Sequence, residues 1–143
     1  MFLGTHQPKL DEKGRFFLPA KFREELAEGL VVTRAQDRCL AIYSEATFSE
    51  LARKMASGPS TVKGVRDFQR MLAAGASNEV PDKQGRITIP PQLRKYAGLE
   101  KEIVVVGAID RVEIWDAVAW ENYSAEQEEV FADMNEVVVD GEN

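Results

Sequence analysis

The 143-residue sequence contains a single cysteine, Cys39, and a single histidine, His6. One cysteine excludes an internal disulfide framework and any multi-cysteine zinc or iron–sulfur site, and one histidine excludes a histidine-rich metal site and disfavours a His-based catalytic triad. No apolar stretch approaches the roughly 18–20 residues that cross a bilayer, and no secretory signal pattern is visible at the N-terminus. We therefore expect a cytoplasmic protein that needs neither a metal nor a membrane.

Basic residues are missing from the end of the chain. Residues 121–143 hold eight acids and no Lys or Arg, which leaves 18 bases against 16 acids in residues 1–120. The body of the protein is therefore slightly basic, although the whole chain has a net charge of −6. Because the local field governs association with a polyanion, the overall negative charge does not exclude nucleic acid as a partner.

The composition is that of a folded chain, and the chain contains an internal repeat. Hydrophobic residues make up 44% and charged residues 29%, which excludes collagen-like or wholly disordered character. Residues 11–23 align with residues 82–94 at an offset of 71, and residues 42–51 continue the series against residues 114–123 at an offset of 72. Such an ordered series indicates a duplication. The identical pairs in the first block are Asp11/Asp82, Gly14/Gly85, Arg15/Arg86, Pro19/Pro90 and Arg23/Arg94.

Each copy predicts the same order of elements: hairpin, helix, hairpin, helix. The Asp-x-x-Gly pattern indicates a tight turn, in which the carboxylate accepts backbone N–H groups and glycine supplies a positive φ. Proline then opens a helix, glycine ends it, and a second hairpin leads to a capped helix. The predicted segments are return strands at 16–18 and 87–89, helices opened by Pro19 and Pro90 and ended near Gly29 and Gly98, strands at 30–33, 40–43, 103–106 and 112–115, and helices capped by Ser44 and Asp116.

The predicted fold class is α+β, mainly β. Each copy is too small to bury a core alone, so we expect the two copies to share one core. The predicted units are a first repeat at 1–51, a linker with a helix at 52–77, a second repeat at 78–123 and an acidic C-terminal tail at 124–143.

The most informative motif for function is Asp-x-x-Gly-Arg, which occurs twice. Each copy presents an arginine beside a lysine, and a guanidinium group can grip a phosphate or pair with guanine O6 and N7. A single copy is better explained as a solvated hairpin with a routine Asp–Arg contact, but two copies at matched places favour a repetitive, charged ligand such as double-stranded DNA. The candidate DNA-binding residues are Arg15, Arg86, Lys13 and Lys83, supported by Asp11, Asp82, Gly14 and Gly85.

Catalytic and cofactor roles are weaker alternatives. Asp11 and Asp82 would have to share a proton to act as a carboxylate dyad, and the adjacent arginines favour two ionised groups instead. Gly14 and Gly85 stand singly, so no phosphate-cradling glycine loop is present. We interpret His6 as a packed or solvated residue and Cys39 and the tryptophans as core residues, whereas Phe17 is a candidate for contact with a partner subunit. We expect no enzymatic activity, no cofactor and no small-molecule substrate.

With these residues in view, the chain resembles the MraZ family of bacterial transcriptional regulators of the division and cell-wall gene cluster. The resemblance extends from Met1 to about Tyr123. It is carried by the segments at 9–15, 18–23, 82–87 and 113–115, and by the ordered pair of motifs. One copy alone would indicate only the wider AbrB-like group of swapped-hairpin regulators.

The resemblance implies two AbrB-like (SpoVT-AbrB) halves that form a pseudo-twofold, barrel-like domain with flanking helices, and a ring-shaped homo-oligomer. It also implies nucleoid-associated binding to direct repeats in a promoter and repression of the downstream genes. The DNA-contacting arginines of the family map onto Arg15 and Arg86, with Asp11 and Asp82 as their motif partners. A ring scaffold whose basic loops bind proteins remains the alternative.

Overall fold

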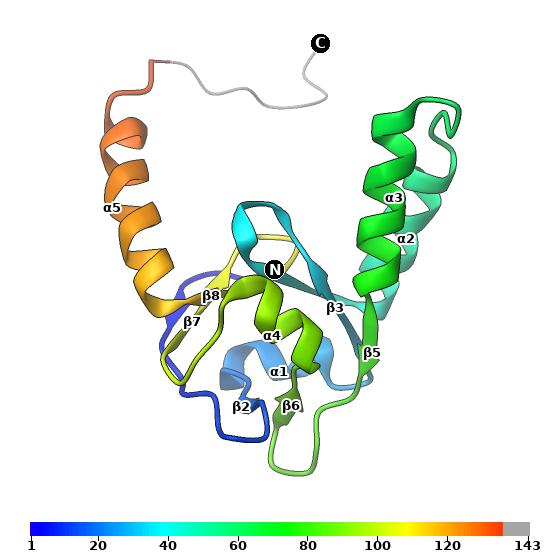
Figure 1. Ribbon diagram of the computed structural model, residues 1–143. Helices are drawn as coiled ribbons and strands as arrows, with labels where there is room; N and C mark the ends of the chain where they lie inside the picture. Colours follow the sequence, from blue (N-terminus) through cyan, green and yellow to red (C-terminus); the bar gives the residue numbers. More distant parts are fainter. Residues whose placement is uncertain (136–143) are drawn as a thin grey trace.

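The computed structural model describes residues 1–135, which form an α+β fold with eight strands and five α-helices, as Figure 1 shows. The strands are β1 (Thr5–His6), β2 (Arg15–Phe17), β3 (Leu30–Arg34), β4 (Leu40–Ser44), β5 (Ser77–Glu79), β6 (Arg86–Thr88), β7 (Ile103–Gly107) and β8 (Val112–Asp116). The α-helices are α1 (Ala20–Leu26), α2 (Glu45–Ala56), α3 (Lys63–Gly75), α4 (Pro91–Ala97) and α5 (Ala117–Ala132), and a 3₁₀ turn, η1, covers Gln36–Arg38. The predicted strands of the second hairpins are each confirmed to within one residue.

The main sheet has the strand order β1-β7-β8-β4-β3-β5, which is symmetric about its centre. Each strand of the first repeat has its counterpart at the mirrored place, and the central pair is β4 with β8. Ala41 lies opposite Glu113, its own equivalent at the offset of 72. A pseudo-twofold axis therefore relates the two repeats, as expected. The sheet stays open, with β1 and β5 at its edges.

A second, two-stranded sheet joins the repeats, because β2 pairs with β6 and not with a strand of its own copy. The sequence pattern predicts that each return strand pairs with the segment just before its turn. This is wrong beyond the turn, because β2 and β6 pair with each other. The swapped arrangement expected from the family resemblance is confirmed. The antiparallel register pairs Arg15 with Thr88, Phe16 with Ile87 and Phe17 with Arg86. We call this sheet the ribbon.

Backbone bonds beyond the ribbon also cross between repeats. The N–H of Leu18 donates to the carbonyl of Gly85 (3.0 Å), and the N–H of Ile89 donates to the carbonyl of Gly14 (2.8 Å). Each turn is thus held by the other repeat. On the core side of the ribbon, Phe16 and Ile87 are both buried. Neither repeat has a complete fold without the other.

The core is shared in the same way. Pro19 and Pro90 stand at the N-caps of α1 and α4, and each helix buries two residues one turn apart, Phe22 and Leu26 in α1 and Leu93 and Ala97 in α4. Gly98 caps α4 in the left-handed conformation as predicted, whereas α1 is capped by Ala27 and Gly29 follows later. One cluster contains buried residues of both repeats: Phe2, Leu10, Phe16, Leu18, Phe22, Leu26, Leu30, Val32, Leu40, Ile42, Ile87, Ile89, Leu93, Ala97, Ile103, Val105, Val112 and Ile114.

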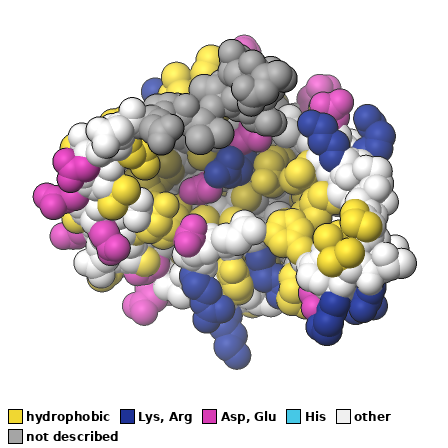
Figure 2. All heavy atoms as spheres, turned by 90° about the horizontal axis from the view of Figure 1, so that it is seen from above, with side chains coloured by type: hydrophobic (Ala, Val, Ile, Leu, Met, Phe, Trp, Pro, Cys, Tyr) yellow, Lys and Arg dark blue, Asp and Glu magenta, His cyan; other side chains and the backbone are white. Residues whose placement is uncertain are grey.

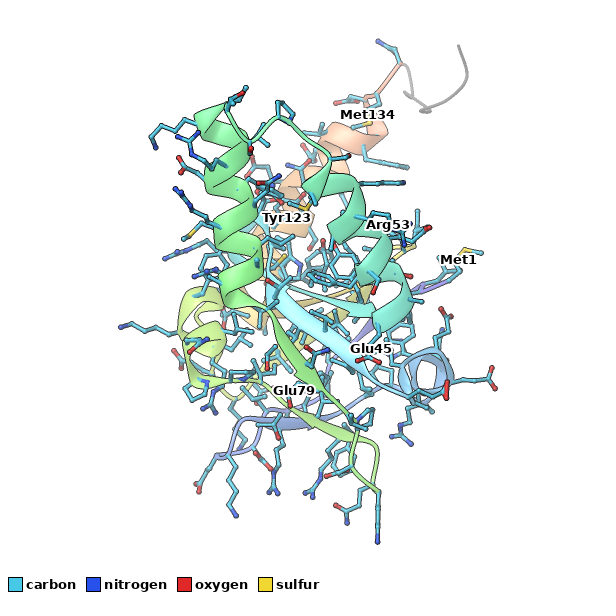
Figure 3. The ribbon with its side chains drawn as sticks, turned by 90° about the vertical axis from the view of Figure 1, so that its right-hand side faces the viewer. Met1, Glu45, Arg53, Glu79, Tyr123 and Met134 are labelled. Carbon is cyan, nitrogen blue, oxygen red and sulfur yellow. The ribbon has the colours of Figure 1, made fainter. Side chains whose placement is uncertain are left out.

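The remaining helices rise from the opposite side of the main sheet (Figures 1 and 3). The predicted caps are confirmed: Ser44 Oγ accepts from the N–H of Thr47 (3.2 Å) at the start of α2, and Asp116 accepts from the N–H of Ala119 (3.1 Å) at the start of α5. Figure 2, seen from this side, shows hydrophobic side chains on both walls of the hollow between α5 and the α2–α3 pair. No helix within residues 1–135 is long and apolar enough to span a bilayer.

The acidic C-terminal tail predicted at 124–143 is only partly described. Helix α5 continues past the predicted boundary and ends at Ala132, so residues 124–132 are helical. Residues 136–143 lie outside the described part of the chain.

Candidate nucleic-acid interface

The first Asp-x-x-Gly-Arg motif folds into a turn in which one carboxylate serves three donors. Asp11 Oδ1 accepts from the backbone N–H groups of Lys13 (2.9 Å) and Arg15 (2.8 Å), and Oδ2 accepts from Arg15 Nε (2.8 Å). The turn is closed by a bond from Gly14 N–H to Asp11 O (3.0 Å), and Gly14 has a φ of +80°. The side chain of Asp11 therefore shapes the turn and orients the arginine at once.

The second motif repeats this geometry. Asp82 Oδ1 accepts from the N–H groups of Gln84 (2.9 Å) and Arg86 (2.8 Å), and Oδ2 accepts from Arg86 Nε (2.8 Å). Gly85 also has a φ of +80°. The same sequence pattern thus yields the same network at both places, as the repeat predicts.

Both carboxylates are stabilised in the charged form. The backbone N–H of Arg15 contributes most to holding the pKa of Asp11 below its ordinary value of 3.8. Desolvation opposes it, and the Arg15 side chain and the N–H of Lys13 lower the pKa further. The pKa of Asp82 is lowered in the same way, first by the backbone N–H of Arg86. A carboxylate dyad needs one group that keeps a proton, so this arrangement disfavours the acid–base alternative.

In both guanidinium groups, Nη1 and Nη2 have no hydrogen-bond partner among the described residues. Each Nε is engaged by its aspartate, and neither Arg15 nor Arg86 makes a further side-chain hydrogen bond to any residue among those described. The side chains are 30% and 24% exposed. Because the aspartate occupies only one edge, Nη1 and Nη2 are left to contact a ligand.

Both arginines lie on one face of the ribbon. Side chains alternate between faces along a strand, so Arg15, Phe17, Arg86 and Thr88 share the outer face. Arg15 and Arg86 are diagonal neighbours there, which places their Cα atoms about 7–8 Å apart. Figures 1 and 3 show this end of the molecule on the side opposite α2, α3 and α5. The topology therefore brings together two residues 71 positions apart in the sequence.

The two candidate lysines are exposed but not equivalent. Lys13 is the third residue of its turn and Lys83 is the second, so Gln84 stands where the first copy has Lys13. Neither lysine side chain forms an ion pair with another described residue. Both extend the positive charge of the interface beyond the ribbon.

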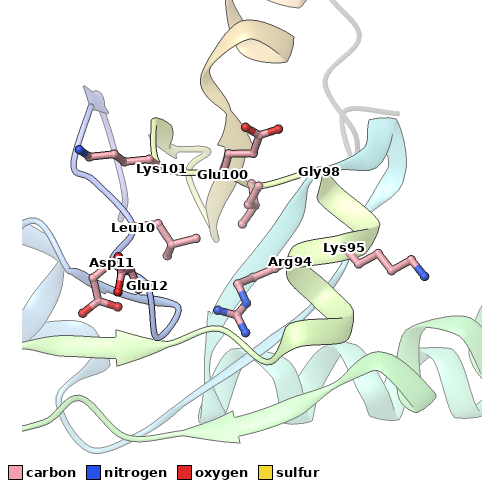
Figure 4. A pocket seen from close by; sticks show the side chains of 9 residues that line it. Leu10, Asp11, Glu12, Arg94, Lys95, Gly98, Glu100 and Lys101 are labelled. Atoms are coloured by element: carbon pink, nitrogen blue, oxygen red, sulfur yellow. The ribbon is translucent and has the colours of Figure 1, made fainter.

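Two further arginines, to which we assigned no role from the sequence, contact the turns across the repeats. The guanidinium group of Arg94, on α4, lies directly over the Cα of Gly14, and Figure 4 shows it pointing toward the loop that holds Asp11 and Glu12. The side chain of Arg23, on α1, covers Gly85 in the same way, and its Nε donates to the carbonyl of Leu18 (2.9 Å). A Cβ at Gly85 would lie 2.7 Å from Arg23 Nε, so a larger residue there would displace the Arg23 side chain, and the positive φ is what favours glycine. The sequence offered one signal for this role, because Arg23 and Arg94 are arginines at equivalent positions of the two repeats.

The other sequence candidates pack as interpreted. His6 stacks edge-on against Phe22 with ring centroids 5.2 Å apart, and Trp115 packs against Trp120 at 5.2 Å. Cys39 is buried, and burial raises the pKa of its thiol to about 12, which leaves it unreactive. Within residues 1–135, no group of three or more His, Cys, Asp or Glu side chains is arranged to hold a metal ion.

The chain matches known proteins over almost its whole length. A family model described as "MraZ protein, putative antitoxin-like" matches twice, over residues 1–71 and 72–140. A protein of Cutibacterium acnes is 72% identical over 134 residues, which cover 94% of each chain, and one of Thermobifida fusca is 57% identical over 141 residues, which cover 99% of each chain. A protein of Leifsonia xyli is also 57% identical over 141 residues, with the same coverage. All three are named transcriptional regulator MraZ.

The chain belongs to the MraZ family. The division between the two family matches falls inside α3, so each match contains one Asp-x-x-Gly-Arg turn. Membership in the MraZ family thus agrees with the two repeats that the sequence indicates and with the pseudo-twofold arrangement of the strands.

Proposed function

We propose that this protein is a sequence-specific DNA-binding transcriptional repressor of the division and cell-wall gene cluster. The observation that carries the proposal is the pair of guanidinium groups on one exposed face, each oriented through Nε by an ionised aspartate and open at Nη1 and Nη2. The names of the relatives, which are transcriptional regulators, support the same role. The proposal includes no enzymatic activity, cofactor or small-molecule substrate.

The dimensions of the ribbon suit the major groove. A two-stranded ribbon enters a groove about 12 Å wide, and two arginines whose Cα atoms lie about 7–8 Å apart on one face reach the edges of nearby base pairs. In that position Arg15 and Arg86 pair with guanine O6 and N7, while Lys13 and Lys83 contact phosphates on either side. The lysine contacts position the protein and the arginine contacts specify the sequence.

One ribbon makes few contacts, so useful affinity requires several of them. We infer that the protein forms a ring-shaped homo-oligomer, which holds many ribbons at fixed spacing and converts successive contacts into intramolecular ones. Direct repeats in a promoter would match that spacing, and occupation of the promoter would block transcription. The protein would then act in the cytoplasm at the nucleoid.

The decisive experiment is a gel-shift titration on the DNA upstream of the protein's own gene, preceded by footprinting of that DNA. Arg15→Ala and Arg86→Ala should each weaken binding by roughly 10-fold to 100-fold, because each removes one guanine contact. Light scattering should show the same oligomer for both variants and the parent. Loss of binding only together with loss of the oligomer would show that the arginines serve assembly instead of recognition.

A salt series separates DNA binding from the scaffold alternative. If the basic turns bind DNA, the logarithm of the affinity falls linearly with the logarithm of salt concentration, and removal of Lys13 makes the slope shallower by about one phosphate contact. A protein-binding scaffold gives no saturable, salt-sensitive DNA complex at micromolar protein. That result would overturn the proposed function.

A further inference from the structure

The outer face of the ribbon is nearly symmetric, but one pair of residues breaks the symmetry. The pseudo-twofold axis relates Arg15 to Arg86 and Phe17 to Thr88. The arginines are identical, whereas one copy has a phenyl ring where the other has a hydroxyl and a methyl group. Arg86 therefore has a ring opposite it in the register, and Arg15 has a threonine.

Phe17 lies exposed on the outer face of the ribbon and not in the core. Its side chain is 52% exposed, while its neighbour Phe16 is 1% exposed on the opposite face. The Arg86 guanidinium carbon lies 5.9 Å from the centre of the Phe17 ring, within the range of a cation–π contact. The ring thus stands beside one of the two arginines and has no counterpart beside the other.

This asymmetry matters for any reader of double-stranded DNA. A reader with an exact twofold axis in its contact face binds a duplex element equally well in both orientations, so its preferred element is palindromic and has no direction. One apolar ring on one side removes that equivalence. Apolar side chains read the C5-methyl group of thymine in the major groove, and threonine meets either hydrogen-bonding or methyl groups.

We propose that Phe17 is a specificity-determining residue that gives the DNA element its direction: the ring contacts a thymine methyl beside the guanine that Arg86 reads, and Thr88 makes no equivalent contact beside Arg15. The inference rests on the proposed function and names the base that this site selects besides guanine. Each subunit then prefers one orientation of the element, and subunits that follow one another in a ring favour elements in direct repetition.

The other differences between the copies do not produce this effect. Glu12 corresponds to Lys83 and Lys13 corresponds to Gln84, but these residues lie in the turns, outside the ribbon face. Lysines at the margin of the groove contact phosphates, which carry no sequence information directly. They alter affinity and salt dependence, whereas the residue between the two arginines alters the choice of base.

The test is selection of 12-base-pair elements from a random duplex library by the full-length protein and three variants. The parent should enrich a non-palindromic element with thymine next to one of two guanines. Phe17→Thr makes the face symmetric and should enrich a palindromic element in which thymine beside the guanine is no longer preferred over the other bases. Thr88→Phe places a phenyl ring beside each arginine, which also makes the face symmetric, and should enrich a palindrome with thymine beside both guanines. The exchange variant with both substitutions restores one ring and should recover a directional element.

Affinity measurements on the parent's element complete the test. On the thymine-containing element, Phe17→Thr should bind about tenfold more weakly than the parent. On the same element with uracil in place of thymine, the two proteins should bind with almost equal affinity, because uracil lacks the methyl group. Thermal melting followed by circular dichroism verifies that the variants are folded. If Phe17→Thr does not fold, the element selected by Thr88→Phe tests the inference independently.

Three results would overturn the inference. The first is a Phe17→Thr variant that still enriches the parent's directional element. The second is a Phe17→Thr variant that changes the oligomeric mass while its preferred element stays the same, which would place the ring in a contact between subunits. The third is a parent protein that enriches no duplex at all, which would overturn the proposed function and the inference with it.

Discussion

The two repeats are alike at the turns and different at the outer helices. In both copies the arginine Nε lies 2.8 Å from its aspartate, and in both an arginine from the other repeat covers the glycine. The helix that follows the second hairpin has diverged: α2 is paired with α3 from the linker, whereas α5 stands without a second helix among the described residues. The comparison teaches that the two repeats keep the same turn geometry, whereas the arrangement of their outer helices differs.

The outer helices attach through aromatic clusters of unequal burial. In the second repeat, Trp115 is 4% exposed and packs against both Trp120 and Tyr123. In the first repeat, the equivalent Tyr43 is half-buried and packs against Phe48 with ring centroids 5.8 Å apart. The second cluster is therefore more deeply buried, and within residues 1–135 no second helix is paired with α5.

The largest predicted effect comes from this difference. Trp115→Ala should lower the free energy of unfolding by about 3–5 kcal/mol, because it removes a buried indole that anchors α5. Tyr43→Ala should cost roughly 1–2 kcal/mol, since its side chain is only half-buried and α3 also supports α2. Urea unfolding of the full chain measures both values. Equal losses would mean that the two outer helices are anchored alike.

The glycines of the two turns give the next comparison. Gly14→Ala and Gly85→Ala each force a side chain into a φ of +80°, which costs about 1–2 kcal/mol. Gly14 is buried under the Arg94 guanidinium, whereas Gly85 is partly exposed under Arg23, so Gly14→Ala should be the more destabilising. Gly98→Ala is the matched control, because Gly98 also has a positive φ, of +62°, and a Cβ there meets nothing within 4 Å. A larger loss at Gly85 would contradict the tighter packing of the first turn.

The crossed arginines are tested by a double-mutant cycle. Arg94 belongs to the second repeat but covers the turn of the first, so Arg94→Met should couple to Arg15→Ala by about 1 kcal/mol and add independently to Arg86→Ala. DNA affinity supplies one readout, and hydrogen exchange of the Lys13 and Gly14 amides supplies a second that needs no DNA. The mirrored cycle with Arg23→Met should reverse the pattern. If Arg94→Met coupled to Arg86→Ala and not to Arg15→Ala, the contact between the repeats would not contribute to DNA binding.

The shape of each turn was predictable because the hydrogen bonds to its aspartate are local. The donors to Asp11 lie two and four positions further along, so the pattern itself contains the network. The partner of β2 was not predictable from alternation, since Phe16 alternates in the same way whichever strand it pairs with. The contact of Arg94 with Gly14 depends on that pairing and was missed with it. The extension of α5 was missed because the acidic charge of 124–132 outweighed its helix-forming alanines and glutamates in the interpretation.

The smallest predicted effect separates backbone from side-chain contributions within one turn. Since the pKa of Asp11 is lowered in the folded protein, its contribution to stability is present above 3.8 and is lost as the pH falls through the lower folded value. Carbon-detected NMR titration should place the midpoints of Asp11 and Asp82 below 3.8 in the parent. In Arg15→Ala the midpoint of Asp11 should rise only part of the way, because the backbone N–H of residue 15 remains the main donor. Asp82 stays unchanged in that variant and is the internal control. A complete return of Asp11 to 3.8 would assign the shift to the guanidinium group, and the likeness of the two turns would then rest on their arginines instead of their backbone.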